Sequence, residues 1–285
     1  RLARLPRRSV MAEQFEPPWC ESPKWLGAEG FVPCRRCRLC KHTKASVWAS
    51  RIVWELLTCG EHGVFVTLTY RDYVEGGKHE RELCAPLDEL GRPVLVREHW
   101  VKFMKAFRKL LAKERRKCRF FMVGDYGERG TRRCHFHAII LGAWVLDEWM
   151  LRKAWPFGFV DVKEANHGRC RYVANYVVKQ DGEERSDGRP PVFHGMSNGI
   201  GQTAVGPIVG RVEALEERLG SSGLRLSDVP RTFRQDGVER QVPKAILDGV
   251  REALGIPKDA YSRRGGVAVV RPGAGPGLRR RLRHQ

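Results

Sequence analysis

The chain has 285 residues, enough for one large domain or for a domain with a second lobe. Hydrophobic residues make up 42% of it, which supports a packed core and excludes a chain that is disordered throughout. Its 52 Lys and Arg against 33 Asp and Glu give a formal net charge of +19, which favours a polyanionic partner. We find no long uncharged apolar run and no signal peptide, so we expect a soluble protein rather than one bound to membrane.

The first segment, residues 1–18, is rich in arginine and has little apolar periodicity, which predicts a disordered basic arm. Met11 is a candidate for the natural first residue.

Nine cysteines follow along the chain, and three of them form a C-x2-C-x2-C run at Cys34, Cys37 and Cys40. In an intracellular chain this spacing favours a metal knuckle over a disulfide framework. A structural zinc site needs a fourth ligand, for which His42 and Cys59 are candidates. Three reduced thiols in a turn before a helix are an equally good interpretation.

Helical and strand patterns alternate after the cysteines. Apolar residues at helical spacing predict helices over 43–58 and 97–114, and alternation predicts a strand over 65–70. The charged stretch 71–96 between them predicts a loop.

Aromatic and β-branched residues predict a hairpin with arms at 119–127 and 134–141, separated by a glycine-rich turn. His135 and His137 are two residues apart on the second arm. Successive strand residues point to opposite faces, so the two imidazoles share a face. A pair of buried histidines, or of zinc ligands, is the alternative interpretation of this motif alone.

A carboxylate would complete a metal site beside these histidines. Asp125 lies near the end of the partner strand, and Glu128 in the turn is the reserve candidate. Two nitrogens and one carboxylate oxygen leave positions on Mg or Mn open for phosphate oxygens.

A predicted helix over 168–180 carries Tyr172, Tyr176 and Lys179 on one face and valines on the other. Phenol is a poor nucleophile at neutral pH because its pKa is about 10. A nearby ammonium and a metal-polarised phosphodiester would ease its deprotonation. The pattern therefore suits attack of a tyrosine on phosphate.

A short helix after residue 146 and a strand over 158–162 complete the order β-α-β-β-α-β-α. This order predicts an α+β domain, an antiparallel sheet with helices on one face. Residues 181–191 form a polar linker or exposed loop, and helices are expected over 207–220 and 243–255.

The H-x-H strand and the Y-x-x-x-Y-x-x-K helix together resemble the HUH endonucleases, and among them the replication initiators of gokushovirus-like microviruses. The matching segments occur in that family's order and span roughly 32 to 234. They are 32–37, 65–72, 124–127, 135–138, 172–179, 196–197 with 199–201, and 229–231.

The resemblance implies a ferredoxin-like sheet with the histidines on a central strand. With it, the chain divides into a basic arm 1–18, an HUH endonuclease domain 19–205 that contains the cysteine-rich segment 34–40, a helical extension 206–260 and a basic tail 261–285.

The resemblance also implies metal-dependent nicking and joining of single-stranded DNA at a viral origin through a 5′-phosphotyrosine. His135, His137 and Asp125 would hold Mg or Mn, although many relatives have Glu where this chain has Asp125. Tyr172 and Tyr176 would be the nucleophiles, and Lys179 would contact the phosphate or activate the phenol.

Origin DNA, host helicase and host polymerase are the expected partners, in the cytoplasm of a bacterial host. Three alternatives stay open: a non-enzymatic zinc-stabilised nucleic-acid-binding protein, another HUH enzyme such as a transposase or relaxase, and a nuclease in which water attacks.

Overall fold

The computed structural model describes residues 20–27, 30–60, 62–127, 133–179, 187–221, 225–226, 228–235, 237–256 and 269–270. It divides the chain into two compact units, Arg1–Lys44 and Ala45–Gln285. The predicted arm 1–18, the reserve ligand Glu128 and the tail 261–285, apart from two residues, lie outside the described part. The predicted domain boundaries at 18, 205 and 260 stay a prediction.

The described part of the first unit is small. Two short strands, β1 (Lys24–Trp25) and β2 (Phe31–Val32), pair antiparallel, and helix α1 (Arg38–Thr58) begins after them. The helix starts five residues before the predicted 43–58, so the last of the three clustered cysteines lies in its first turn.

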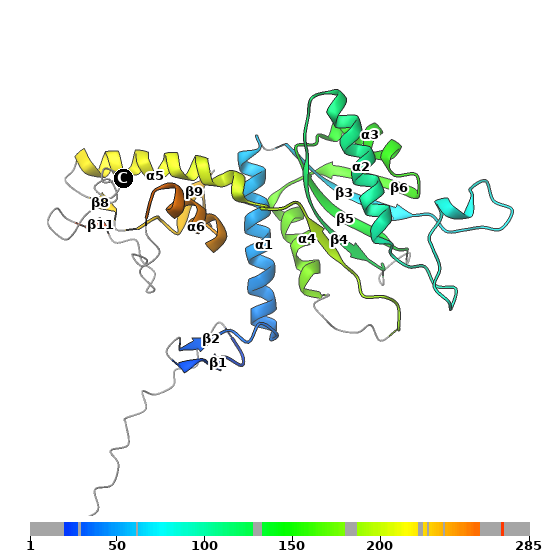
Figure 1. Ribbon diagram of the computed structural model, residues 1–285, viewed down its shortest axis with the longest axis horizontal. Helices are drawn as coiled ribbons and strands as arrows, with labels where there is room; N and C mark the ends of the chain where they lie inside the picture. The colour runs from blue at the N-terminus through cyan, green and yellow to red at the C-terminus, as the bar shows by residue number, and fades with distance from the viewer. Residues whose placement is uncertain are drawn as a thin grey trace, which may run out of the picture. The chain divides into compact units, whose positions relative to one another are not determined.

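The second unit contains a five-stranded sheet in which every neighbouring pair is antiparallel (Figure 1). Its strands, in spatial order, are β6 (Gly158–Glu164), β3 (Gly63–Tyr70), β5 (His135–Leu141), β4 (Arg119–Asp125) and β7 (His194–Met196). The histidine-bearing strand is the central one, and the predicted α+β class with an antiparallel sheet is confirmed.

Two helices connect four of these strands. The run β3-α2-β4-β5-α3-β6, with α2 (Arg97–Lys113) and α3 (Glu148–Ala154), follows the β-α-β-β-α-β order of ferredoxin-like domains. β7 was not predicted, because three residues are too short for a pattern of alternation.

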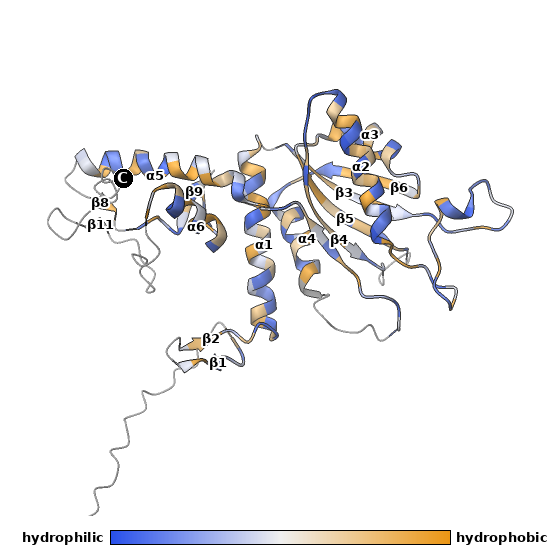
Figure 2. Ribbon diagram, viewed as in Figure 1, coloured by the Kyte–Doolittle hydropathy of each residue, from blue (hydrophilic) through white to orange (hydrophobic). Residues whose placement is uncertain are grey.

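Helices cover both faces of this sheet, so the prediction of helices on one face is wrong. α2 and α3 pack on the face that carries Phe136, while α1 and α4 (His167–Lys179) pack on the face that carries Ile139 (Figure 1). The reason is in the strands: every residue of β5 after His135 is buried, so neither face could be left to water. Figure 2 shows the hydrophobic colour along these central strands.

The C-terminal part of the described chain packs on α1 around a third apolar cluster that includes Trp54. The helices expected over 207–220 and 243–255 are confirmed as α5 and α6. The elements of this part are η4 (Gln202–Ala204), α5 (Val205–Ser221), β8 (Arg225–Leu226), β9 (Thr232–Gln235), β10 (Val238–Gln241), α6 (Lys244–Ala253) and β11 (Val269–Val270). Two further short helices, η2 (Arg81–Leu83) and η3 (Val145–Asp147), lie in the loops of the sheet. Among the described helices, none combines the length and apolar character that a membrane crossing needs.

A buried carboxylate joins α1 to the sheet. Glu55 is 1% exposed and accepts hydrogen bonds from the guanidinium of Arg119 on β4 and from the backbone N–H of Gly201. These bonds satisfy a charge that would be strongly disfavoured alone in the core. They also fix helix α1 against the edge of the site face.

Glu55→Gln should lower the free energy of unfolding by about 2 kcal/mol, because a charged acceptor with two buried partners is replaced by a neutral one. Chemical denaturation of the full chain measures this change. The matched control is Glu148→Gln, which breaks an exposed ion pair with Arg152 and should change stability by less than about 0.5 kcal/mol. Equal effects of the two substitutions would contradict the assignment.

Candidate active site

The register of the central strands sets the core of the candidate site. His135 lies opposite Asp125 of β4 on one side and opposite Thr69 of β3 on the other. His137 lies opposite Thr67 in the next row. Directly opposed residues of an antiparallel pair point to the same face. The two imidazoles, the carboxylate and two hydroxyls therefore emerge together beneath α4.

Hydrogen bonds to the two ring Nδ1 atoms orient the histidines. His135 Nδ1 lies 2.8 Å from the carbonyl oxygen of Arg133, so this nitrogen carries the proton and donates it. His137 Nδ1 lies 3.1 Å from Thr67 Oγ1. Both Nε2 atoms consequently face the site, 3.1 Å from each other.

The geometry of the donor atoms fits a single divalent cation. Asp125 Oδ2 lies 3.5 Å from His135 Nε2, and the ligand atoms of Asp125, His135 and His137 all lie within 4.8 Å of one another. Adjacent ligands of an octahedral ion with bonds of about 2.1 Å are about 3.0 Å apart, close to the separation of the two imidazole nitrogens. Lone pairs facing each other at such distances need a cation or a proton between them.

Charge and burial separate the two histidines. Burial and the neighbouring His135 lower the pKa of His137 to about 4, so its imidazole is neutral near pH 7. Burial also opposes the charged form of His135, but the Asp125 carboxylate outweighs it and raises the pKa of His135. In return, His135 lowers the pKa of Asp125 in spite of its burial. The site thus holds a neutral imidazole beside a paired imidazole and carboxylate.

Helix α4 brings both predicted tyrosines over this cluster. The Tyr172 hydroxyl lies 3.4 Å from His137 Nε2 and 2.7 Å from the Tyr176 hydroxyl. Tyr172 is 44% exposed, whereas Tyr176 is buried, and burial followed by the hydrogen bond from Tyr172 raises the pKa of the Tyr176 phenol. Val173 and Val177 pack inward, as the helical pattern predicts. Lys179 ends the helix, and its side chain is outside the described part, as is all of Glu128.

Sequence reasoning missed three side chains around the cluster. Phe65 stacks on His137 with ring centroids 5.4 Å apart, and Thr67 holds the same ring. Phe159 of β6 lies opposite Thr69, in the row of His135, and is 55% exposed. The signal was the strand alternation at 65–69, which puts Phe65 and Thr67 on one face, but the neighbouring strand could not be assigned from it.

The clustered cysteines gather a fourth thiol that the sequence analysis did not propose. Cys20 joins Cys34, Cys37 and Cys40, and all four sulfurs lie within 4.8 Å of one another. Neither predicted fourth ligand is in this group: His42 is exposed, and the Cys59 thiol bonds carbonyl oxygens near its own helix end. Cys20 is 14 residues from Cys34, too far for a local spacing rule to identify it.

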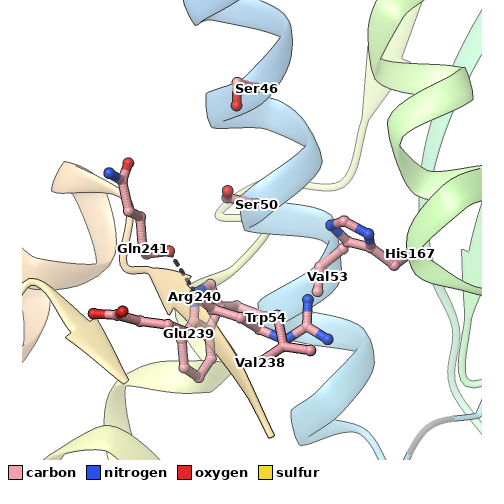
Figure 3. A pocket seen from close by; sticks show the side chains of 9 residues that line it. All are labelled: Ser46, Ser50, Val53, Trp54, His167, Val238, Glu239, Arg240 and Gln241. Carbon is pink, nitrogen blue, oxygen red and sulfur yellow. Dashed lines mark hydrogen bonds between the residues drawn. The ribbon is translucent and has the colours of Figure 1, made fainter. Parts of the chain in front are cut away.

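A separate pocket of about 240 Å³ lies between α1 and strand β10 (Figure 3). The indole N–H of Trp54 donates to the carbonyl oxygen of Gln241 beside it, a bond of 3.0 Å that anchors β10 to the helix. The lining includes Ser50, His167 and Arg240 but no residue of the histidine–tyrosine cluster. It is therefore not part of the candidate active site.

Comparison with known proteins places the central segment in a family. Residues 63–181 match the family described as replication-associated protein ORF2. The chain is 29% identical over 190 residues to replication-associated protein ORF2 of Spiroplasma virus 4, covering 60% of this chain and 55% of the relative. It is 29% identical over 170 residues to replication-associated protein ORF4 of Chlamydia phage 1, covering 52% of this chain and 38% of the relative.

The chain thus spans about half or less of the length of these curated relatives. No solved structure matches it. The matched range begins with β3 and contains both histidines, Asp125 and both tyrosines. Residues 63–181 therefore form a domain of the replication-associated protein ORF2 family, and the resemblance to microvirus-type replication proteins is confirmed.

Proposed function

We propose that this protein initiates rolling-circle replication by nicking and rejoining single-stranded DNA at a viral origin, through a 5′-phosphotyrosine intermediate. The observation that carries the proposal is the convergence of two phenols on two imidazoles and a carboxylate. The Tyr172 hydroxyl contacts both the Tyr176 hydroxyl and His137 Nε2. The family of the domain supports a role in replication.

In this proposal His135, His137 and Asp125 bind one divalent cation, Mg²⁺ or Mn²⁺, and its charge stabilises the negative charge that develops on the scissile phosphate. The phenol oxygen forms a bond to phosphorus as the bond from phosphorus to the 3′-oxygen breaks. The phenol loses its proton, and the departing 3′-hydroxyl gains one. The phosphotyrosine conserves the phosphodiester, so the same site can rejoin ends.

The two tyrosines differ in a way that suggests an order of use. Tyr172 is partly open to solvent, while Tyr176 lies beneath it and has a raised pKa. A strand arriving from solvent meets Tyr172 first, and the raised pKa disfavours Tyr176 as a nucleophile until the local charge changes. We infer that Tyr172 makes the first cut and that Tyr176 is available for a second transfer.

An exposed aromatic ring at the rim offers a contact for the DNA bases. Phe159 points from the edge strand β6 to the same face as His135, and the Arg133 guanidinium lies 5.7 Å from its ring centroid. A ring for base stacking beside a cation for phosphate is the usual pairing in single-strand binding sites. This contact, rather than the net charge alone, would place a strand across the site.

Lys179 is assigned to phosphate contact or phenol activation, and host helicase and polymerase are the proposed partners, in the cytoplasm of a bacterial host. The non-enzymatic binding protein and the water-activating nuclease remain alternatives that the next experiment separates. A transposase or relaxase is less well supported, because the matched family is one of replication proteins.

A labelled single-stranded origin oligonucleotide incubated with the protein and Mn²⁺ should give a covalent protein–DNA band on a denaturing gel. Tyr172→Phe should reduce the initial rate of adduct formation at least about tenfold more than Tyr176→Phe, and the double variant should form none. Removing metal with EDTA should also abolish the band. Tyr73→Phe, a change at a similarly exposed tyrosine outside the site, is the matched control.

Cleavage without an adduct would support the water-activating nuclease. Binding without cleavage, by folded and metal-loaded protein tested on several microvirus-type origins, would support the non-enzymatic binding protein. Either result removes the proposed chemistry.

Thr67→Val should weaken Mn²⁺ binding by about 10- to 100-fold, because the hydroxyl that orients His137 is lost while the shape is kept. Isothermal titration calorimetry measures the affinity. Thr69→Val makes the same change two residues along the same strand face and should alter the affinity by less than about threefold. Equal losses in both variants would argue against orientation through Thr67.

Phe159→Ala should weaken binding of single-stranded DNA by about 1 to 3 kcal/mol, roughly 5- to 150-fold, as expected for loss of one stacked base. Fluorescence anisotropy of a labelled oligonucleotide measures this. Trp149→Ala removes an equally exposed ring from α3, on the opposite side of the sheet, and should leave the affinity unchanged. Unchanged binding in Phe159→Ala would exclude the stacking contact.

A further inference from the structure

We propose that Cys20, Cys34, Cys37 and Cys40 bind one Zn²⁺ ion and that this ion holds the first unit in its fold. The site is distinct from the histidine–carboxylate cluster in ligands and in role. Its existence does not depend on the proposed DNA chemistry.

The separations of the sulfur atoms match a tetrahedral thiolate site. Cys20 Sγ lies 3.6 Å from Cys40 Sγ and 3.9 Å from Cys37 Sγ, and Cys34 Sγ lies 3.9 Å from Cys40 Sγ. Four sulfurs bound at about 2.3 Å around zinc are about 3.8 Å apart along each tetrahedral edge. A disulfide would bring two sulfurs to about 2.05 Å. The spacing therefore corresponds to four thiolates around an ion and not to cross-links.

Backbone N–H groups surround the sulfurs as they would surround charged thiolates. Cys37 Sγ accepts from the N–H of Glu21 and from that of Cys40, both at 3.4 Å. Cys20 Sγ accepts from the N–H of Cys34, and Cys34 Sγ from that of Cys37, both at 3.3 Å. Four thiolates and one Zn²⁺ carry a net charge of −2, which these dipoles offset. Basic residues next to the ligands add to this compensation: Arg35, Arg36, Arg38 and Lys41.

The first unit has almost no other means of staying folded. In its described part, residues 20–27 and 30–44, the buried side chains are those of Cys20 and Cys40. Its two strands have two residues each, and Trp25 is 63% exposed. A segment without an apolar core needs a cross-link or a metal. Four protein ligands leave no open coordination position, so the ion is structural rather than catalytic.

The ligands come from separated points of the segment. Cys20 precedes the β1–β2 hairpin, Cys34 and Cys37 follow it, and Cys40 lies in the first turn of α1. Binding one ion therefore closes the hairpin and fixes the start of the helix together. Metal binding and folding of this segment should be a single event.

The test uses the full chain, purified reduced with added Zn²⁺ and then dialysed against metal-free buffer. Elemental analysis should find one zinc per chain that dialysis does not remove. Replacement by Co²⁺ should give the charge-transfer absorption of thiolate–cobalt bonds, which is specific to sulfur ligands. Cys20→Ser should lower zinc affinity at least about tenfold and remove amide exchange protection from residues 20–44.

Variants that keep or avoid the ligands separate metal binding from simple unfolding. Cys20→His restores a ligand and should retain one zinc with a weaker thiolate–cobalt band, whereas Cys20→Ser does not. Cys59→Ser changes a cysteine outside the group and should behave as the unchanged protein. The double variant His135→Ala/His137→Ala should keep the thiolate–cobalt band, because it removes only the proposed catalytic ligands.

Three results would overturn the proposal. One is a reduced protein that retains no zinc, another is equal zinc affinity in Cys20→Ser and the unchanged chain, and the third is a disulfide among these cysteines in protein that has been kept reduced. None of these results bears on adduct formation at the tyrosines, so the two proposals fail separately.

Discussion

The pairing register of β5 between β3 and β4 is the constraint on which the candidate site depends. It places His135 between Thr69 and Asp125, and His137 beside Thr67. Side chains alternate along a strand, so a slip of one residue would send both imidazoles to the opposite face and turn Phe136 into the site. The buried apolar residues on both faces of β5 prevent that slip, because it would misplace every one of them.

The same packing that fixes the register gives the cluster its electrostatic character. The site lies under α4 on a face lined by apolar side chains, where charges interact more strongly than in water. Burial drives His137 to its neutral, metal-binding form, and the charge of Asp125 remains because His135 pairs with it. Tyr172 keeps an opening to solvent on the helix side. A dry interior with one open edge suits chemistry on a polyanion that enters from outside.

The two metal-ligand groups of the described chain show two ways of organising polar side chains. In the second unit a large apolar core holds the ligands in place, and the ligands can serve chemistry. In the described part of the first unit the ligands are themselves the buried residues. The donor types agree with this division, since imidazole and carboxylate leave open positions for a substrate, whereas four thiolates close the coordination sphere.

The sequence by itself determined the elements of the site, since strand alternation puts His135 and His137 on one face and helical spacing puts Tyr172 and Tyr176 on another. These are local patterns, and they survive folding unchanged. Only the tertiary structure decided which elements meet. Helix cover on both faces of the sheet, the contact of Thr67 with His137 and the arrival of Cys20 among the other cysteines all join residues far apart in the chain. Such contacts follow from the packing of a whole core, which no periodicity in a short window encodes.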